Sequence, residues 1–238
     1  MTDVHQLVWG GSRPSLLAIW VAAGESPEWI AARTDALLRQ LQAAFDVPQW
    51  DMPTGDRWEG SPEDLAQIVR RNPVQEMVSG DQIGDPIAGE GYSFTVSGVG
   101  PRVAPLVRVA AGNVAVGRRM PRRRLTVELR EAVAGGVTSD AADAVCAAVA
   151  ETWKPAAAEF ADLAVRRLAR RGNWKIGVGY RTWISAEVGV ISRIAEGLSA
   201  AELSGGTMIS APDDWSAEQV VAAMTETLAA NGLDEVPH

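Results

Sequence analysis

The strongest constraint on the fold is an alternation of apolar and polar residues in the middle of the chain. In 92–97, Tyr, Phe and Val alternate with Ser, Thr and Ser, and in 125–130, Leu, Val and Leu alternate with Thr, Glu and Arg. A period of two puts one set of side chains in the core and the other in water. Apolar runs at 103–109 and 114–116, separated by Gly112-Asn113, predict two more strands around a hairpin-like turn. We therefore expect an antiparallel meander with one wet face.

Three further strands are expected outside this meander. Ser15 to Ala22 is a short apolar run with the length of a buried strand, and Gly205-Gly206 opens another strand over 207–210. The longest alternation runs from Trp174 to Ile184, and it predicts a strand of eleven residues. Residues 160–171 fit neither period well, and we expect a helix there.

Four helices are predicted from start signals followed by apolar stripes at spacings of three and four residues. A serine followed by a proline begins the first two, at Ser26-Pro27 and Ser61-Pro62. Ser139 begins the third, and a capping box at 216–219 begins the last. Together these elements indicate an α+β fold, in which a largely antiparallel mixed sheet packs with about four helices in a single domain over 1–238.

The composition is that of an ordinary globular protein. The 238 residues are 47% hydrophobic and 22% charged, enough to bury a full core. No apolar run approaches the roughly 20 residues of a membrane helix, and the first residues do not resemble a signal peptide. The single cysteine, Cys146, excludes an internal disulfide and fits a reducing compartment. These features predict a cytoplasmic protein that does not bind membranes.

Charge is distributed unevenly along the chain. The net charge of −8 is made up of −8 in 1–97, +8 in 98–181 and −8 in 182–238. An acidic protein is not expected to bind nucleic acid in general, and an acidic face would suit a basic partner. We expect the acidic ends to neutralise the basic middle in three dimensions. The rival is a nucleic-acid face built on Arg118, Arg119, Arg122, Arg123 and Arg124.

No convincing catalytic centre is visible. The two histidines, His5 and His238, stand at opposite ends of the chain, and Cys146 falls in the apolar half of a predicted helix. The glycine pairs in 98–100 and 177–179 lack the third glycine of a phosphate-binding loop. Nucleophilic, zinc-dependent and nucleotide-dependent chemistry are therefore not expected.

Two acid pairs leave one enzymatic alternative open. Asp213-Asp214 precedes a helix, and Asp81 with Asp85 lies on a glycine-rich loop, so either pair could hold a metal ion or serve as general acid and base. Helix-start and turn chemistry explains both pairs without any reaction. We therefore assign no catalytic, metal-binding or cofactor-binding residue, and the alternative is a metal-dependent hydrolase.

Nine tryptophans are many for this length, and indole rings serve both as core packing and as interface anchors. Four lie in predicted regular elements and are expected in the core, namely Trp20, Trp153, Trp174 and Trp183. Three lie in predicted loops and are better candidates for a contact surface, namely Trp50, Trp58 and Trp215.

Three stretches of the second half carry a family resemblance. They are Trp153-Lys154-Pro155, Gly179-Tyr180-Arg181-Thr182-Trp183-Ile184, and Gly205-Gly206-Thr207-Met208-Ile209 before an amphipathic helix. Together with the helix from Pro27 to Phe45 followed by Trp50, they resemble the immunity protein 52 family of bacterial polymorphic toxin systems, although the aromatic order in the second stretch is swapped. The resemblance implies an α+β immunity protein without enzymatic activity, which binds and neutralises a cognate secreted toxin, often a nuclease of the restriction-endonuclease fold.

The partner-binding surface is predicted at acidic loop and helix-start positions and at loop tryptophans. The residues are Trp58, Asp81, Asp85, Asp213, Asp214, Trp215 and Glu218. Acidic side chains at these positions would attract a basic toxin through long-range electrostatics. The motif residues Gly179, Gly205, Trp153 and Trp183 are expected to be structural.

Overall fold

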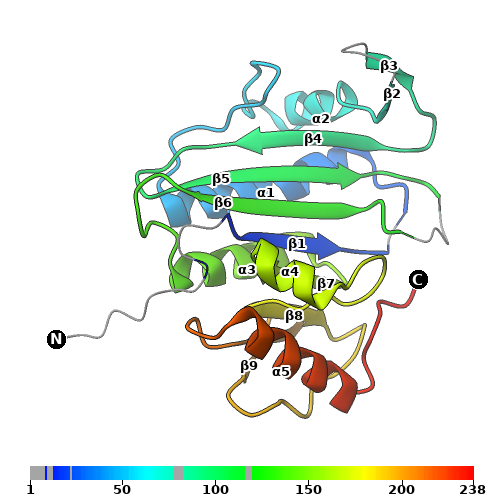
Figure 1. The fold of residues 1–238 in the computed structure, drawn as a ribbon. Helices are drawn as coiled ribbons and strands as arrows, with labels where there is room; N and C mark the ends of the chain where they lie inside the picture. The colour runs from blue at the N-terminus through cyan, green and yellow to red at the C-terminus, as the bar shows by residue number, and fades with distance from the viewer. Residues whose placement is uncertain (1–8, 10–12, 22, 78–82, 116–119) are drawn as a thin grey trace.

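The computed structural model describes residues 9, 13–21, 23–77, 83–115 and 120–238, and Figure 1 shows its fold. The main sheet contains β1 (Ser15–Ile19), β4 (Tyr92–Ser97), β5 (Val103–Ala111), β6 (Arg124–Glu131), β7 (Ala157–Ala161), β8 (Arg181–Ser185), β9 (Ser199–Leu203) and β10 (Gly206–Ser210). A small second sheet pairs β2 (Gln75–Met77) with β3 (Ile83–Pro86). The helices are α1 (Pro27–Phe45), α2 (Pro62–Arg70), α3 (Ser139–Trp153), α4 (Leu163–Ala169) and α5 (Ala217–Ala230). The predicted α+β class is confirmed.

The strand order of the main sheet is β4-β5-β6-β1-β7-β8-β10-β9, and each neighbouring pair is antiparallel. The predicted meander is present as β4, β5 and β6, in which Phe94 lies opposite Val109 and Val107 lies opposite Val127. The first strand of the chain, β1, is inserted between β6 and β7. Main-chain hydrogen bonds of one sheet therefore join the two halves of the chain.

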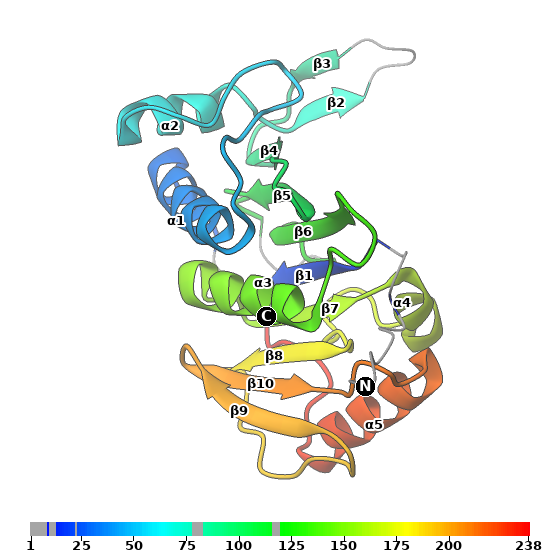
Figure 2. The same ribbon diagram turned by 90° about the vertical axis from the view of Figure 1, so that its left-hand side faces the viewer.

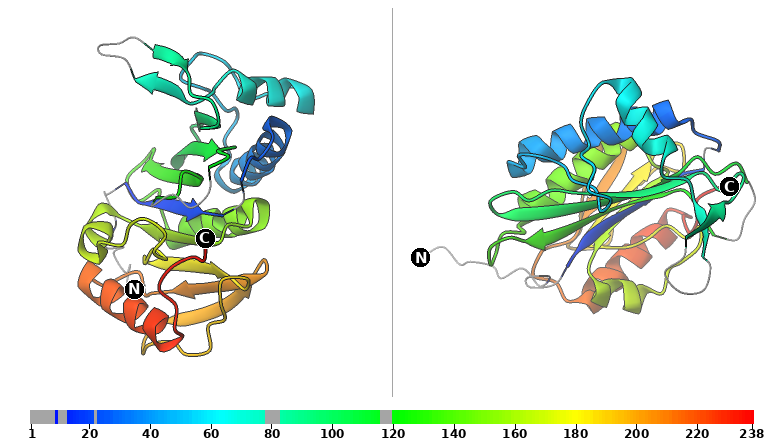
Figure 3. Two further views of the ribbon diagram at one scale, coloured as in Figure 1. Left: turned by 90° about the vertical axis from the view of Figure 1, so that its right-hand side faces the viewer. Right: turned by 90° about the horizontal axis from the view of Figure 1, so that it is seen from above.

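Helices lie on both faces of the main sheet. Figures 2 and 3 show α1, α2 and α3 on one face of the sheet. Helices α4 and α5 lie on the other face, over the strands from the carboxy-terminal half of the chain. Figure 1 views β4, β5 and β6 from the side on which no described helix lies. On that side Arg108 and Arg130 are exposed, whereas Val107 and Leu129 on the opposite side are buried. The predicted wet face is therefore confirmed.

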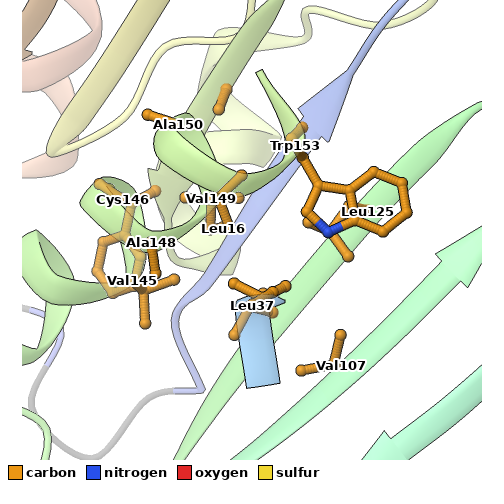
Figure 4. Close-up of a cluster of buried hydrophobic side chains, with 14 of the residues drawn as sticks. Leu16, Leu37, Val107, Leu125, Val145, Cys146, Ala148, Val149, Ala150 and Trp153 are labelled. Atoms are coloured by element: carbon orange, nitrogen blue, oxygen red, sulfur yellow. The ribbon is translucent and has the colours of Figure 1, made fainter. Parts of the chain in front are cut away.

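The core forms where α1 and α3 pack on the sheet. Ser26 caps α1 through its side chain and Pro27 begins the helix, as the sequence predicts. Leu37 of α1, Val107 of β5 and Trp153 of α3 gather in the cluster shown in Figure 4. Each large apolar side chain contributes roughly 1.5–3 kcal/mol when it is fully buried. The four tryptophans expected in the core are buried, namely Trp20, Trp153, Trp174 and Trp183.

Within the described ranges, none of the helices has both the length and the apolar character that are needed to cross a membrane.

The predicted strand of eleven residues from Trp174 to Ile184 is wrong over its first part. Only 181–185 pairs within the main sheet. Before it, the chain is held by the carboxy-terminal segment, because the N–H of Val236 donates to the carbonyl of Trp174 at 2.8 Å. The N–H of Ile176 likewise donates to the carbonyl of Asp234 at 2.9 Å. The alternation therefore reflects alternating burial in a segment that is not hydrogen-bonded to a strand of the main sheet.

The expected helix over 160–171 begins later than predicted. Residues 157–161 form β7, and α4 follows after Asp162, whose carboxylate accepts a hydrogen bond from the N–H of Val165. Every residue of β7 is buried, since it is a central strand with neighbours on both edges and packing on both faces. A strand buried on both faces shows no alternation, which explains why the pattern was ambiguous.

Other element predictions fail where strands are short or loops are ordered. Residues 113–115 form no strand, and the rest of the strand predicted at 114–116 lies outside the described residues. Three strands were not predicted, namely β2, β3 and β9. The third helix is capped by Thr138, whose hydroxyl accepts a hydrogen bond from the N–H of Ala141, and Ser139 is its first residue.

Candidate partner-binding surface

Of the three contact residues predicted in the amino-terminal half, Trp58 is buried, Asp85 is exposed and Asp81 lies outside the described residues. Trp58 is 6% exposed and stacks on Phe94, with ring centroids 5.5 Å apart. Its ring is therefore part of the core rather than a free contact anchor. Asp85 is exposed on β3, and Asp81 lies outside the described residues. The position of a tryptophan in a predicted loop therefore does not show whether its side chain is exposed or buried.

Asp213 is partly buried and forms an ion pair with Arg181, a buried cation that is 4% exposed. Arg181 donates to Asp213 Oδ1 at 2.9 Å, to Asp143 Oδ1 at 2.5 Å and to Ser139 Oγ at 2.7 Å. Burial alone would lower the pKa of Arg181, but the hydrogen bonds to the two carboxylates raise it above its usual value. Asp213 therefore fastens the start of α5 to α3 and β8.

Asp214, Trp215 and Glu218 stand close together where β10 connects to α5. Asp214 and Glu218 are exposed, and Trp215 is half-buried. The indole of Trp215 packs on Gly197, where φ is +83° and an added Cβ would collide with the ring. Hydrogen bonds from its own backbone N–H and from Ser216 lower the pKa of Glu218, so its carboxylate is charged at neutral pH.

The predicted contact residues therefore do not form one surface. Asp85 lies on β3, beyond β4 at one end of the molecule, whereas Asp213, Asp214, Trp215 and Glu218 lie at the opposite end beside β10 and α5 (Figure 1). The second group lies near the start of the edge strand β9, an element that was not predicted from the sequence.

The two edges of the main sheet differ in how they are covered. At the β4 edge, Asp51 and Ser97 exchange two main-chain hydrogen bonds of 2.8 Å, and the N–H of Ser93 donates to the carbonyl of Asn72 at 3.0 Å. At the other edge, no described segment pairs with the outer side of β9. An uncovered edge offers unpaired N–H and C=O groups to a further strand.

The side chains of β9 leave this edge accessible. The strand reads Ser-Ala-Ala-Glu-Leu, and its first four residues are exposed. It is short and carries one charge, Glu202, two features that limit uncontrolled edge pairing. Its sequence lacks β-branched and aromatic residues, so no strand propensity marked it. The sequence feature that could have indicated β9 is the Ser204-Gly205 pair after it, which forms the hairpin turn to β10 with φ of 49° and 82°.

Each end of β9 adjoins a distinct feature. Beyond Leu203, an open hollow of about 550 Å³ is lined in part by Leu203, Gly205 and Val190, and Val190 is 72% exposed. Before Ser199, Gly197 carries the ring of Trp215. We call the surface formed by β9, Val190, Asp214, Trp215 and Glu218 the β9 surface.

The β9 surface belongs to an acidic part of the chain. Residues 182–238 hold one basic and nine acidic side chains, a net charge of −8. Glu187, Glu196, Glu202, Asp214 and Glu218 in this region are all exposed. A basic segment would meet a favourable field here.

The rival sites have less support from the geometry. In the part of the chain that the structure describes, there is no group of three or more His, Cys, Asp and Glu side chains able to hold a metal ion. Of the five arginines of the rival nucleic-acid face, Arg123 is buried and donates to the carbonyls of Asn113, Val21 and Ala115. Arg122 lies 3.8 Å from a Glu90 carboxylate oxygen, and 118–119 lie outside the described residues.

The fold defines an α+β protein with an eight-stranded antiparallel sheet that carries helices on both faces. No protein-family model and no curated protein matches the chain. Among solved structures, the T6SS protein PA0821 of Pseudomonas aeruginosa is similar at 9% sequence identity and a TM-score of 0.45. The match covers 83% of this chain and 64% of that one, so the chain spans less than two thirds of that protein. A likeness this distant carries no argument about function.

Proposed function

We propose that this protein is an immunity protein that neutralises a secreted toxin by binding it, without turning over a substrate. Its β9 surface would accept a basic extended segment of the toxin as a ninth strand of the main sheet. The resemblance to immunity protein 52 supplies the class of partner, including a nuclease as one kind of toxin. The contrast between the two sheet edges supplies the place of contact.

The uncovered edge is the observation that carries the proposal. Main-chain hydrogen bonds along an added strand provide affinity for an extended segment of many sequences. Pockets beside the strand then select side chains, and the hollow next to Leu203 and Val190 can receive an apolar one. The acidic groups around the strand favour a basic segment and speed its encounter.

Hydrogen exchange on the complex tests this proposal directly. The protein is co-expressed with the toxin domain encoded beside it, and the purified complex is compared with the free protein. We expect the outward-facing amides of 199–203 to exchange at least tenfold more slowly in the complex, because an added strand occupies them. The outer amides of β4 serve as the internal control and should not change.

Two results would contradict the proposal in different ways. If the neighbouring toxin domain does not co-purify and keeps its toxicity when this protein is present, the immunity function fails. If the two proteins form a stable complex but protection appears away from β9, the function stands and the β9 surface is not the contact.

A further inference from the structure

A second cavity, of about 300 Å³, lies away from the β9 surface on the central strands of the main sheet. It forms where β1, β6 and β7 meet the segment after α4. Six of its lining residues are Leu17, Ile19, Arg124, Ala157, Glu159 and Lys175. Ile19 is the cross-strand neighbour of both Arg124 and Ala157, and Leu17 is the neighbour of Glu159. The sheet register therefore sets an apolar floor between a cation and a buried acid.

Glu159 is an unusual side chain for this position. It lies in the middle of β7 and is 9% exposed. Its one ion-pair partner among the described residues is Arg166, at 3.3 Å from Oε1, and the two terminal nitrogens of Arg166 donate instead to Ser15 at 2.6 Å. The remaining oxygen, Oε2, lies against Gly177, where an added Cβ would collide with it. Gly177 therefore leaves the space in which the carboxyl group sits.

The basic side chains at the cavity differ in whether they already have hydrogen-bond or ion-pair partners within the protein. Arg171 donates to the carbonyl of Ile176 and to Asp234, and Lys175 is ion-paired with Asp234. Arg124 is exposed, and its guanidinium group makes no hydrogen bond or ion pair within the described ranges. Arg124 is thus the cation that remains available to a ligand at this cavity.

We propose that this cavity binds an aliphatic carboxylate, with the alkyl part on Leu17, Ile19 and Ala157 and the carboxylate at Arg124. Apolar surface and a charged rim together select an amphipathic acid over a purely polar anion. The carboxyl group of Glu159, when protonated, can donate a hydrogen bond to the bound anion, whereas an ionised Glu159 repels it. The ligand is either a free short-chain acid or a glutamate side chain presented by a partner, and the proposal is independent of the β9 surface.

Binding should strengthen as the pH falls through neutrality. Arg166 from α4 is ion-paired with Glu159, and the other charged groups that line the cavity are Arg124 from β6 and Arg171 with Lys175 from the segment after α4. Arg171 and Lys175 are themselves paired with Asp234. Burial raises the pKa of Glu159 from 4.5 to about 7, and the charge of Arg166 offsets this only in part. Glu159 is therefore mostly protonated at pH 6 and mostly ionised at pH 8.

The test is a titration of the isotope-labelled full-length protein, followed by NMR amide shifts. Butyrate is the free acid, acetyl-Ala-Glu-Ala-amide presents a glutamate side chain, and butyramide is the uncharged control. At pH 6 we expect saturable shifts around 17–19, 157–159 and 177 with at least one of the acids and none with butyramide. Tighter binding of butyrate identifies a free acid as the ligand, and tighter binding of the peptide identifies a partner's side chain.

Variants separate this site from a non-specific effect. Arg124→Gln should weaken binding about tenfold, since a charge-assisted contact is lost. Arg108→Gln, also on the wet face but outside the cavity lining, is the matched control and should bind normally. Glu159→Gln, which resembles the protonated acid, should bind at pH 8 as well as at pH 6, whereas wild-type binding should weaken about tenfold over that range.

Three outcomes would overturn the proposal. These are the absence of saturable shifts with either acid at pH 6, equal shifts with butyramide, and unchanged affinity in Arg124→Gln. Because Arg124 is exposed, its substitution should not prevent folding, and far-ultraviolet circular dichroism of the variant confirms that the protein is intact.

Discussion

At the scale of single residues, the neighbouring acids Asp213 and Asp214 have different roles. Asp213 neutralises the buried Arg181, whereas Asp214 is exposed. We expect Asp213→Asn to lower the free energy of unfolding by roughly 1–3 kcal/mol, because a buried charge loses part of its compensation. Asp214→Asn should change it by less than about 0.5 kcal/mol. Urea denaturation of both variants measures the difference, and equal effects would contradict the assignment.

Glu159 makes a second prediction, in the dependence of stability on pH. Its carboxyl group has a pKa of about 7 in the folded state and 4.5 as the reference value, so the folded state holds the proton more tightly. The stabilising contribution is fully present below about pH 4.5 and is lost as the pH rises through 7, a change of roughly 3 kcal/mol.

Glu159→Gln should therefore remove most of this pH dependence between pH 5 and 8. Denaturant unfolding at several pH values checks it, with Glu151→Gln on the exposed side of α3 as the control. A wild-type protein that is equally stable at pH 5 and pH 8, or a Glu159→Gln variant with the same slope, would contradict the role of Glu159.

At the scale of elements, the approach to β8 depends on close backbone packing. An added Cβ at Gly179 would collide with the carbonyl oxygen of Phe160 on β7, whereas one at Gly172 meets nothing within 4 Å. We expect Gly179→Ala to destabilise the protein by roughly 2 kcal/mol or more and Gly172→Ala to be close to neutral. Thermal unfolding of the two variants tests this. A similar melting temperature for both would show that β7 and β8 can move apart.

The edge strand β9 makes a prediction about association rates. Because Glu202 is the charged residue of the strand and is exposed, Glu202→Lys should slow association with a basic toxin several-fold at low salt, and added salt should reduce the difference. Stopped-flow association measures the rate, and Glu151→Lys provides the same charge change away from β9. An equal effect of both substitutions would mean that only the net charge matters.

At the scale of the whole molecule, ion pairs explain the charge pattern of the sequence. Some basic side chains of the middle pair with acids of both ends, and others pair with acids of the middle itself, such as Arg166 with Glu159. Arg122 lies near Glu90, Arg181 pairs with Asp213, and Arg171 with Lys175 pairs with Asp234. Partners so far apart in the sequence could not be assigned from it, because ion pairing depends on distances in space.

The position of β1 predicts that the whole molecule unfolds as one unit. The buried side chains form one continuous cluster, and β1 lies between strands from both halves of the chain. We expect tryptophan fluorescence and far-ultraviolet circular dichroism to report the same single transition in urea, as for one domain over 1–238. Two separated transitions would contradict the single-domain prediction.

Local patterns in the sequence determined most of the helices and the meander, but the longest alternation, from Trp174 to Ile184, predicted a strand of which only 181–185 belongs to the main sheet. Periodicity reports burial, and burial alternates regularly only in elements with one wet face. The fully buried β7 and the alanine-rich β9 were therefore missed. The alternating segment at 174–180 was predicted as part of a strand of the main sheet, but it pairs with the carboxy-terminal segment instead.

Only the tertiary structure decided which groups are available for function. Trp58 lies in a loop but is buried by its long-range contact with Phe94, and Asp213 is used by Arg181. The open edge at β9 and the cavity at Glu159 both result from the strand order, which brings distant segments side by side. The sequence determined the local elements because these depend on neighbouring residues, whereas edges and cavities depend on pairings across the whole chain.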